Sequence, residues 1–247
     1  MIRYLSILLC TLFLAFASCE DKEKSNKNIT TTPPNTEVST NQEVEEETRK
    51  KEAETTQQEE DEKIGPLIVQ EEFIPFMTEY GEENPETRVR IKTRFGDIDV
   101  QLYRNTPLHR ANFIYLAKRG YFDGTFFHRV AKGFVIQGGN SDNRETSRKR
   151  NHIGSFLIPS EFEAGHRHTR GAFSAAKYSQ QNVSKASSPY EFFIVQSHRG
   201  AHHLDNDHTV FGRVTSGMDV VDEIAEQEVS EGEWPMVNIH IEVEILD

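Results

Sequence analysis

The sequence predicts a mainly β domain, a closed or nearly closed antiparallel barrel, that follows a flexible tether. From residue 88 onward the chain contains many short runs of β-branched and aromatic residues, most of them bounded by turn-forming residues. Only two stretches in this part have helical spacing, and residues 20–62 contain almost no large apolar side chains. Many short strands with few helices are typical of antiparallel barrels, in which closure removes exposed strand edges.

The barrel is expected to begin with a hairpin. Val89 and Ile91 alternate with charged residues, and a tight turn at residues 95–97 leads into a second alternating run at 98–102. This alternation predicts two half-buried strands, because successive side chains of a strand point to opposite faces. Further strands are expected at residues 126–130, 134–137, 172–176, 192–196, 209–214 and 237–245.

Two helices are expected among these strands. Thr106 and Pro107 form a favourable helix start, because threonine caps free amides and proline is tolerated in the first turn. Apolar residues follow at helical spacing as far as Gly120, and a second helix is expected at residues 218–226.

Residues 1–18 are typical of an export signal. Arg3 supplies the positive start, and the apolar run of about fourteen residues that follows is shorter than the roughly twenty of a membrane-spanning helix. Ala17-Ser18-Cys19 resembles a bacterial lipobox, although Phe16 stands where leucine is usual. We therefore expect lipidation of Cys19 and a protein anchored to a membrane of the cell envelope, facing the periplasm or the cell surface. The alternative is an ordinary cleaved secretion signal.

Residues 19–63 are expected to form an acidic flexible tether. A segment rich in Glu, Thr, Asn, Gln and Lys cannot bury enough apolar surface to offset the entropy of ordering it. Residues 64–87 contain several large apolar side chains, so we expect this transition segment to pack on the domain that follows at residues 88–247.

Charge and cysteine content limit the possible partners and chemistry. The formal net charge of −12, without a basic stripe, argues against a nucleic-acid partner. Cys10 and Cys19 are the only cysteines, so the domain has no disulfide, no thiol nucleophile and no cysteine-bound metal. We expect a monomer.

Arg129 is the most informative residue of the domain. It lies among strand-forming apolar residues in the segment 126–139, with Phe134 and Gln137 nearby and a Gly-Gly turn at the end. A cation in a barrel wall is costly to desolvate unless a polar or anionic group meets it. Arg129 is therefore a candidate functional residue, and the alternative is a structural ion pair.

The motif FHRV, followed by GFVIQGG, within residues 127–139 resembles the signature of the cyclophilins, the peptidyl-prolyl cis/trans isomerases. Three later segments agree with that family in order and spacing: GAFSAA at 171–176, EFFI at 191–194 and the stretch 204–212, which ends in HTVFG. The opening hairpin also fits, so the resemblance covers residues 88–247.

The resemblance implies a closed eight-stranded antiparallel barrel capped by two α-helices, with a peptide groove on its outer face and no metal or organic cofactor. It implies that Arg129 is the catalytic residue, placed beside the prolyl nitrogen of the substrate. Substrate-binding roles are implied for Phe134, Val135, Gln137, Ala176, Lys177, Glu191, Phe193, His203, Leu204 and His208. The expected partners are proline-containing polypeptide segments, and the expected function is assistance in the folding of exported proteins.

Several residues depart from the family pattern. Glu191 stands where glutamine is usual, and a carboxylate near Arg129 is expected to pair with it and compete with substrate. His203 replaces a common tryptophan, and Lys177 and Tyr178 replace small residues of the rim. These departures leave open a second interpretation, a catalytically weak module that binds proline-bearing peptides on the same fold.

Two further kinds of site find little support in the sequence. A hydrolase built on Glu191 and His208 lacks a nucleophile in a recognisable setting. Histidine pairs occur at 166 with 168 and at 202 with 203, but no carboxylate stands at a spacing diagnostic of a metal site.

Overall fold

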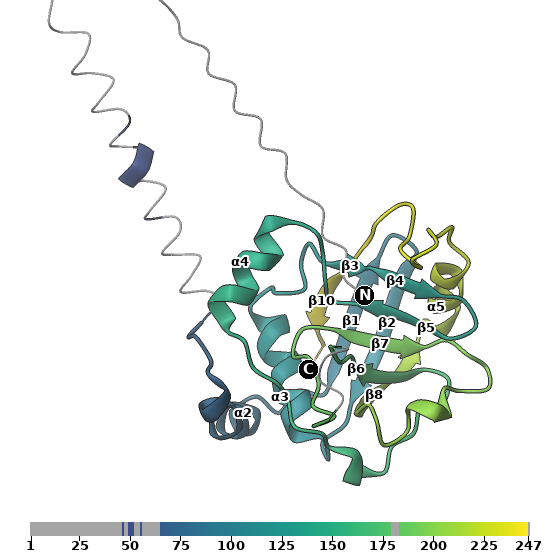
Figure 1. Cartoon of the computed structure of the whole chain (residues 1–247), viewed down its shortest axis with the longest axis horizontal. Helices are drawn as coiled ribbons and strands as arrows, with labels where there is room; N and C mark the ends of the chain where they lie inside the picture. Colours follow the sequence, from purple (N-terminus) through teal and green to yellow (C-terminus); the bar gives the residue numbers. More distant parts are fainter. Residues whose placement is uncertain (1–45, 47–48, 52–54, 56–64, 179–182, 247) are drawn as a thin grey trace, which may run out of the picture. The chain divides into compact units, whose positions relative to one another are not determined.

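The computed structural model of the chain describes residues 65–178 and 183–246, together with the isolated positions 46, 49–51 and 55 (Figure 1). The expected signal peptide at residues 1–18, the lipid attachment at Cys19 and almost all of the tether at 19–63 lie outside the described residues. In the part of the chain that is described, no helix combines the length and the hydropathy that crossing a bilayer requires.

An eight-stranded antiparallel sheet forms the body of the domain and curls into a half-barrel (Figure 1). Its strand order is β10-β1-β2-β8-β6-β7-β5-β4. The strands are β1 (Arg88–Thr93), β2 (Gly96–Leu102), β4 (Arg129–Ala131), β5 (Val135–Gly138), β6 (Ala172–Ala175), β7 (Phe192–Val195), β8 (Val210–Ser216) and β10 (Glu242–Ile245). The mainly β, eight-stranded architecture predicted from the sequence is confirmed.

The two edge strands of this sheet are linked by a short separate ladder. β3 (Phe126–Phe127) comes just before β4, and β9 (Ile239–His240) comes just before β10. β3 and β9 pair with each other in antiparallel register, with Phe126 opposite His240. The single intervening residues, His128 and Ile241, interrupt each edge strand, so β4 and β10 do not pair with each other. The eight-stranded sheet itself is therefore a half-barrel rather than the fully closed barrel expected, and the β3–β9 ladder links its two edges.

Four α-helices accompany the sheet within residues 65–246, so the expectation of two was incomplete. α3 (Pro107–Lys118) and α5 (Met218–Ala225) lie where helices were predicted. α2 (Gln70–Glu83) contains Pro75, which obscures its helical pattern in the sequence. α4 (Arg144–Ile153) is almost wholly polar, and it begins where the side chain of Asn143 accepts a hydrogen bond from the Thr146 amide at 2.7 Å.

α2 belongs to the packed domain. Its Phe73 and Met77 are fully buried, and Phe73 stacks on Phe156 with ring centroids 4.8 Å apart. The chain before α2 is held as well, because the Ile68 amide donates to the Ile153 carbonyl at 2.7 Å. A side chain at Gly154 would place its Cβ only 2.2 Å from the Ile68 carbonyl oxygen, so this close approach requires glycine.

Alternation along the central strands builds two apolar clusters on opposite faces of the sheet. Ile136 of β5 and Phe192 of β7 point into the main core of the barrel. Their chain neighbours Val135 and Phe193 belong to a second cluster, against which Phe134 and Leu204 pack. Because strand side chains alternate between faces, this second cluster lies on the outside of the barrel wall. It provides the apolar floor of the candidate site.

Candidate active site

A cavity of about 230 Å³ lies on this outer face. This volume is many times what a single water molecule requires, so the cavity has room for a small organic group. The lining consists of residues that the sequence singled out as site residues: Arg129, Phe134, Val135, Gln137, Ala176, Lys177, Phe193, Leu204 and His208. The fold thus brings together side chains from segments far apart in the sequence.

Strand register places the central residues of the site. Arg129 of β4 lies directly opposite Gln137 of β5, and Gln137 lies opposite Phe193 of β7. All three side chains are on the outer face. Their chain neighbours Val130, Ile136 and Phe192 belong to the main core, and successive side chains of a strand point to opposite faces. The guanidinium carbon of Arg129 lies 5.8 Å from the centroid of the Phe134 ring. The cation therefore stands at the edge of an aromatic, apolar pocket.

His168 holds the loop that carries Leu204 and His208. Its Nδ1 lies 2.9 Å from Asp205 Oδ1, and its Nε2 lies 3.0 Å from the Ser174 hydroxyl in β6. The side chain is fully buried, and burial lowers the pKa of His168 despite the neighbouring carboxylate. With both ring nitrogens hydrogen-bonded, the neutral side chain of His168 connects β6 to the segment around Asp205.

His208 and Lys177 form the polar rim of the cavity. Lys177 is almost completely buried, and its Nζ lies 2.8 Å from Asp207 Oδ1. Burial, together with the positive charge of Lys177, lowers the pKa of His208 to about 4. At neutral pH the rim thus presents an uncharged imidazole, set edge-on to Phe193 with ring centroids 5.6 Å apart, and an ammonium whose charge is matched by Asp207.

Glu191 lies beside the pocket and has partners other than the one expected. Its carboxylate accepts a hydrogen bond from Gln137 Nε2 at 3.0 Å and lies 3.3 Å from a terminal nitrogen of Arg150 in α4 and 3.5 Å from His128 Nε2. Burial alone would raise the pKa of Glu191, but the His128 contact and the charge of Arg150 outweigh it and hold this pKa below its ordinary value.

The contact expected between Glu191 and Arg129 is replaced by a different ion pair. Arg129 Nε donates to Glu233 Oε2 at 2.7 Å instead. Because a carboxylate can only accept, Glu191 also fixes the amide of Gln137, with Nε2 toward Glu191 and Oε1 free to accept a hydrogen bond. The structure therefore corrects the expectation that Glu191 competes with substrate for Arg129.

The remaining predicted residue, His203, stacks on Phe134, with ring centroids 5.4 Å apart. It supports the pocket wall from outside the cavity lining. Of the other histidines considered for a metal site, His166 stacks on Tyr103, whereas His202 Nδ1 lies 3.2 Å from Asp205, the carboxylate that His168 also contacts. Among residues 65–178 and 183–246, no group of three or more potential metal ligands gathers at one point.

Sequence reasoning missed three residues that contact the site. Arg150 had a signal, because it lies in a basic stretch that follows a good helix cap at Asn143. Asp207 immediately precedes the predicted His208 and was overlooked. Glu233 had no recognisable signal, because it lies 104 positions from Arg129 in the chain.

The eight-stranded half-barrel, with an arginine-edged pocket on its outer wall, is the arrangement expected of the cyclophilin class. Residues 88–244 match the family described as cyclophilin type peptidyl-prolyl cis-trans isomerase/CLD, and the chain belongs to this family. The family assignment made from the sequence motifs is therefore confirmed.

Proteins of similar sequence are named as peptidyl-prolyl cis-trans isomerases or as isomerase-like proteins. A peptidyl-prolyl cis-trans isomerase of Acinetobacter baylyi is 37% identical over 141 residues, which cover 56% of this chain and 72% of the relative. Peptidyl-prolyl cis-trans isomerase-like 2 of Rhizopus delemar is 36% identical over 177 residues, which cover 71% of this chain. The match spans only 31% of the length of that second relative.

Solved structures support the fold independently. A cyclophilin-type isomerase of Cryptosporidium parvum, crystallised in the presence of the dipeptide Ala-Pro, superposes with a TM-score of 0.54 at 24% identity. The alignment covers 65% of this chain and 99% of that one. The cyclophilin AquaCyp293 of Hirschia baltica gives a TM-score of 0.51 at 20% identity. At these identities the likeness establishes the fold.

Replacing Glu191 with glutamine should not increase isomerisation of a prolyl peptide. Arg129 is not released by the change, while Arg150 loses its carboxylate partner and Gln137 loses the group that orients its amide. We expect the free energy of unfolding to fall by about 1–3 kcal/mol, as for other partly buried charges that lose a partner. Urea unfolding and a peptide isomerisation assay measure the two effects, and a faster variant would contradict the contacts described.

The stability of the domain should fall as the pH drops from about 6.5 to about 4. In this window the unfolded chain protonates His208, whose ordinary pKa is about 6.5, whereas the folded chain does so only near pH 4. His168 adds to the loss, because its pKa is lowered too. The His208→Gln variant should show a shallower dependence, by up to about 1.4 kcal/mol per pH unit.

Urea unfolding at pH 7, 6 and 5 measures this dependence. Equal slopes for the wild type and His208→Gln would contradict the buried, neutral state of the imidazole.

Proposed function

We propose that the chain is a peptidyl-prolyl cis/trans isomerase whose catalytic residue is Arg129. The observation that carries the proposal is the placement of one guanidinium at the edge of a ring-sized apolar pocket on the outer barrel wall. The family and the names of its relatives support the reaction type. The crystal structure of the Cryptosporidium protein, obtained in the presence of Ala-Pro, supports a proline-containing peptide as substrate.

The reaction requires no nucleophile and no general base. The bond before proline is planar because the amide nitrogen shares its lone pair with the carbonyl, and rotation meets a barrier of about 18–20 kcal/mol. As the bond twists, the lone pair localises on nitrogen and becomes a better hydrogen-bond acceptor. A fixed guanidinium donor at that nitrogen stabilises the twisted state more than the planar one and so accelerates rotation.

The contacts of Arg129 suit this role. Glu233 occupies Nε, so the two terminal nitrogens remain available to the prolyl nitrogen or to the carbonyl before it. Phe134, Phe193 and Leu204 would hold the ring still while the rest of the chain rotates. Gln137 would accept a hydrogen bond from a substrate amide through its free Oε1.

The remaining rim residues would border the substrate on either side of proline. Ala176 leaves room for its backbone, and neutral His208 would cover the ring without adding charge. One ground for the second candidate function, a proline-peptide-binding module with weak turnover, was the expected Glu191–Arg129 pair. Because Glu191 contacts Gln137, Arg150 and His128 instead, we favour the enzyme.

We propose the cell envelope as the site of action. The signal-like residues 1–18 and the lipobox-like Cys19 support a lipid anchor, and the acidic segment 19–63 supports a tether that holds the domain away from the membrane surface. Substrates would then be proline-containing segments of exported proteins, met by a monomeric domain.

Arg129→Ala should lower kcat/KM for a short prolyl peptide by about 10²- to 10³-fold, the usual effect of removing a donor that acts in the transition state. Arg129→Lys should be nearly as slow, because lysine lacks the planar fork. A protease-coupled assay measures the rate, and calorimetry with the same peptide measures binding. If wild type and Arg129→Ala are equally slow and bind the peptide alike, the binding-module interpretation is correct.

Cys19→Ala should move the full chain from the membrane fraction to the soluble fraction of cells, because lipidation has no other acceptor in the sequence Ala17-Ser18-Cys19. Fractionation with detection of the mature chain measures this change. An unchanged distribution would contradict the lipid anchor while leaving the isomerase proposal intact.

A further inference from the structure

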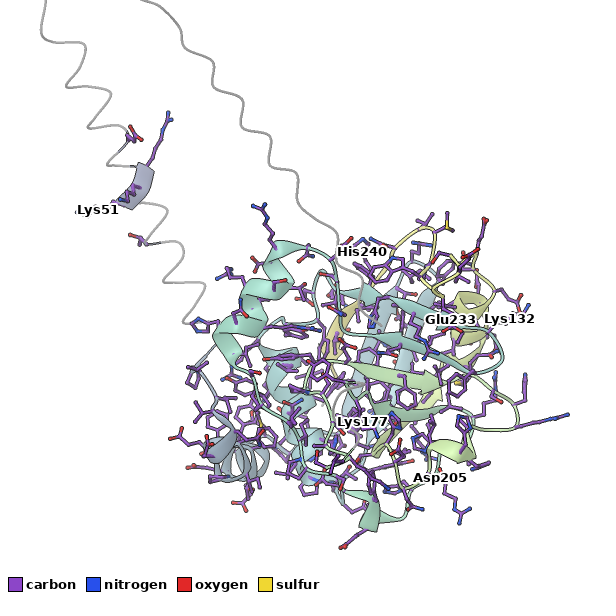
Figure 2. All side chains as sticks on the ribbon, viewed as in Figure 1. Lys51, Lys132, Lys177, Asp205, Glu233 and His240 are labelled. Atoms are coloured by element: carbon purple, nitrogen blue, oxygen red, sulfur yellow. The ribbon has the colours of Figure 1, made fainter. Side chains whose placement is uncertain are left out.

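Glu233 is joined twice to the strand that carries the catalytic arginine. Its side chain accepts a hydrogen bond from Arg129 Nε at 2.7 Å, and its backbone carbonyl accepts one from the Val130 amide at 2.8 Å. β4 is the edge strand of the sheet, so this amide has no neighbouring strand to pair with on that side. Figure 2 labels Glu233 on the C-terminal loop beside the β4–β5 end of the sheet.

The backbone at Glu233 is held in a conformation that L-residues rarely adopt. Its φ angle is +61°, in the left-handed region that normally favours glycine. The loop keeps it there through a bond from the Glu233 amide to the Ser230 carbonyl at 2.9 Å and through Trp234, whose ring packs edge-on against Phe126. Strain of this kind persists only where surrounding contacts impose it, and it is concentrated at functional sites.

Glu233 engages the Nε atom of Arg129 rather than a terminal nitrogen, and this restricts the orientation of the guanidinium group. A hydrogen bond at Nε restrains one edge of the planar group and uses neither terminal nitrogen. The guanidinium carbon stands 5.8 Å from the centroid of the Phe134 ring, so the restrained group lies at the edge of the cavity that Phe134 lines. A free arginine side chain samples many rotamers, and this restraint reduces that number before substrate arrives.

Stability alone does not account for the pair. The side chains of Arg129 and Glu233 are 37% and 42% exposed, and ion pairs as open to solvent as this one contribute little to folding. A competing interpretation is that Glu233 withholds Arg129 from substrate. The engaged atom is Nε rather than a terminal nitrogen, which favours orientation over competition.

We propose that Glu233 is a positioning residue, which orients the guanidinium of Arg129 toward the prolyl nitrogen of the substrate. The proposal rests on the isomerase function proposed above. It assigns to Glu233 no contact with substrate and no part in folding.

The test compares three substitutions at Glu233 in the full chain. Glu233→Ala should lower kcat by about tenfold with little change in peptide affinity, because ground-state contacts are retained. Glu233→Gln should stay within about threefold of wild type, since its amide oxygen still accepts from Nε. Glu233→Gly should be as slow as the alanine variant yet at least as stable, because glycine adopts φ +61° without strain.

Glu226→Ala is the matched control. Glu226, the C-cap residue of α5, pairs with Lys132, which follows β4 and lines no part of the cavity. This variant should therefore retain wild-type turnover. Rates come from line-shape analysis of the cis and trans signals of a prolyl peptide, and thermal unfolding of each variant reports any loss of stability.

A double-mutant cycle shows whether the effect passes through Arg129. In an Arg129→Ala background, Glu233→Ala should cause no further loss of rate. A further loss there, or a Glu233→Ala variant as fast as or faster than wild type, would overturn the positioning role. If Arg129→Ala alone is as fast as wild type, the proposed catalytic function fails instead, so the two failures are distinguishable.

Discussion

The antiparallel register of β4, β5 and β7 is the constraint on which the site depends. It sets Arg129 opposite Gln137 and Gln137 opposite Phe193, so a donor, a polar amide and an apolar ring lie in a row across three strands. A shift by one residue would turn all three side chains into the barrel and bring Val130, Ile136 and their neighbours to the surface. Because the interior is filled with close-packed aromatic side chains, such a shift is strongly disfavoured.

Charge around the pocket is arranged in pairs that leave one directed donor facing the substrate. Lys177 is matched by Asp207, and His208 is neutral at physiological pH. Glu191 is satisfied by Gln137, Arg150 and His128, and it lies to the side of the cavity. The guanidinium of Arg129 keeps its terminal nitrogens free. A site organised in this way suits a reaction in which no bond is made or broken and only the electron distribution of an amide changes.

Local sequence patterns predicted the parts of the fold that depend on local chemistry. The alternation at Val89 and Ile91 and the Thr106-Pro107 start correctly located the hairpin and α3, and the motif around Arg129 correctly located the pocket lining. The expected cap was wrong in its atoms, because the Thr106 hydroxyl donates to the Tyr103 carbonyl and the carboxylate of Glu161 accepts from the first amides of α3 instead. α4 was missed because only Ile153 gives it an apolar position near its end, so it has no apolar periodicity. The predicted partner of Arg129 was also wrong, because the place of Glu191 in the cyclophilin-like motif favoured it, whereas Glu233 reaches the site from a segment 104 positions away in the chain.

The crystal structure of the full chain with Ala-Pro would test the central claim most directly. We expect the pyrrolidine ring to lie against Phe134, Phe193 and Leu204, with a terminal nitrogen of Arg129 within about 3.2 Å of the prolyl nitrogen or of the carbonyl before it. A dipeptide bound elsewhere, or an Arg129 side chain turned out of the cavity while the ring is bound, would contradict catalysis by this guanidinium.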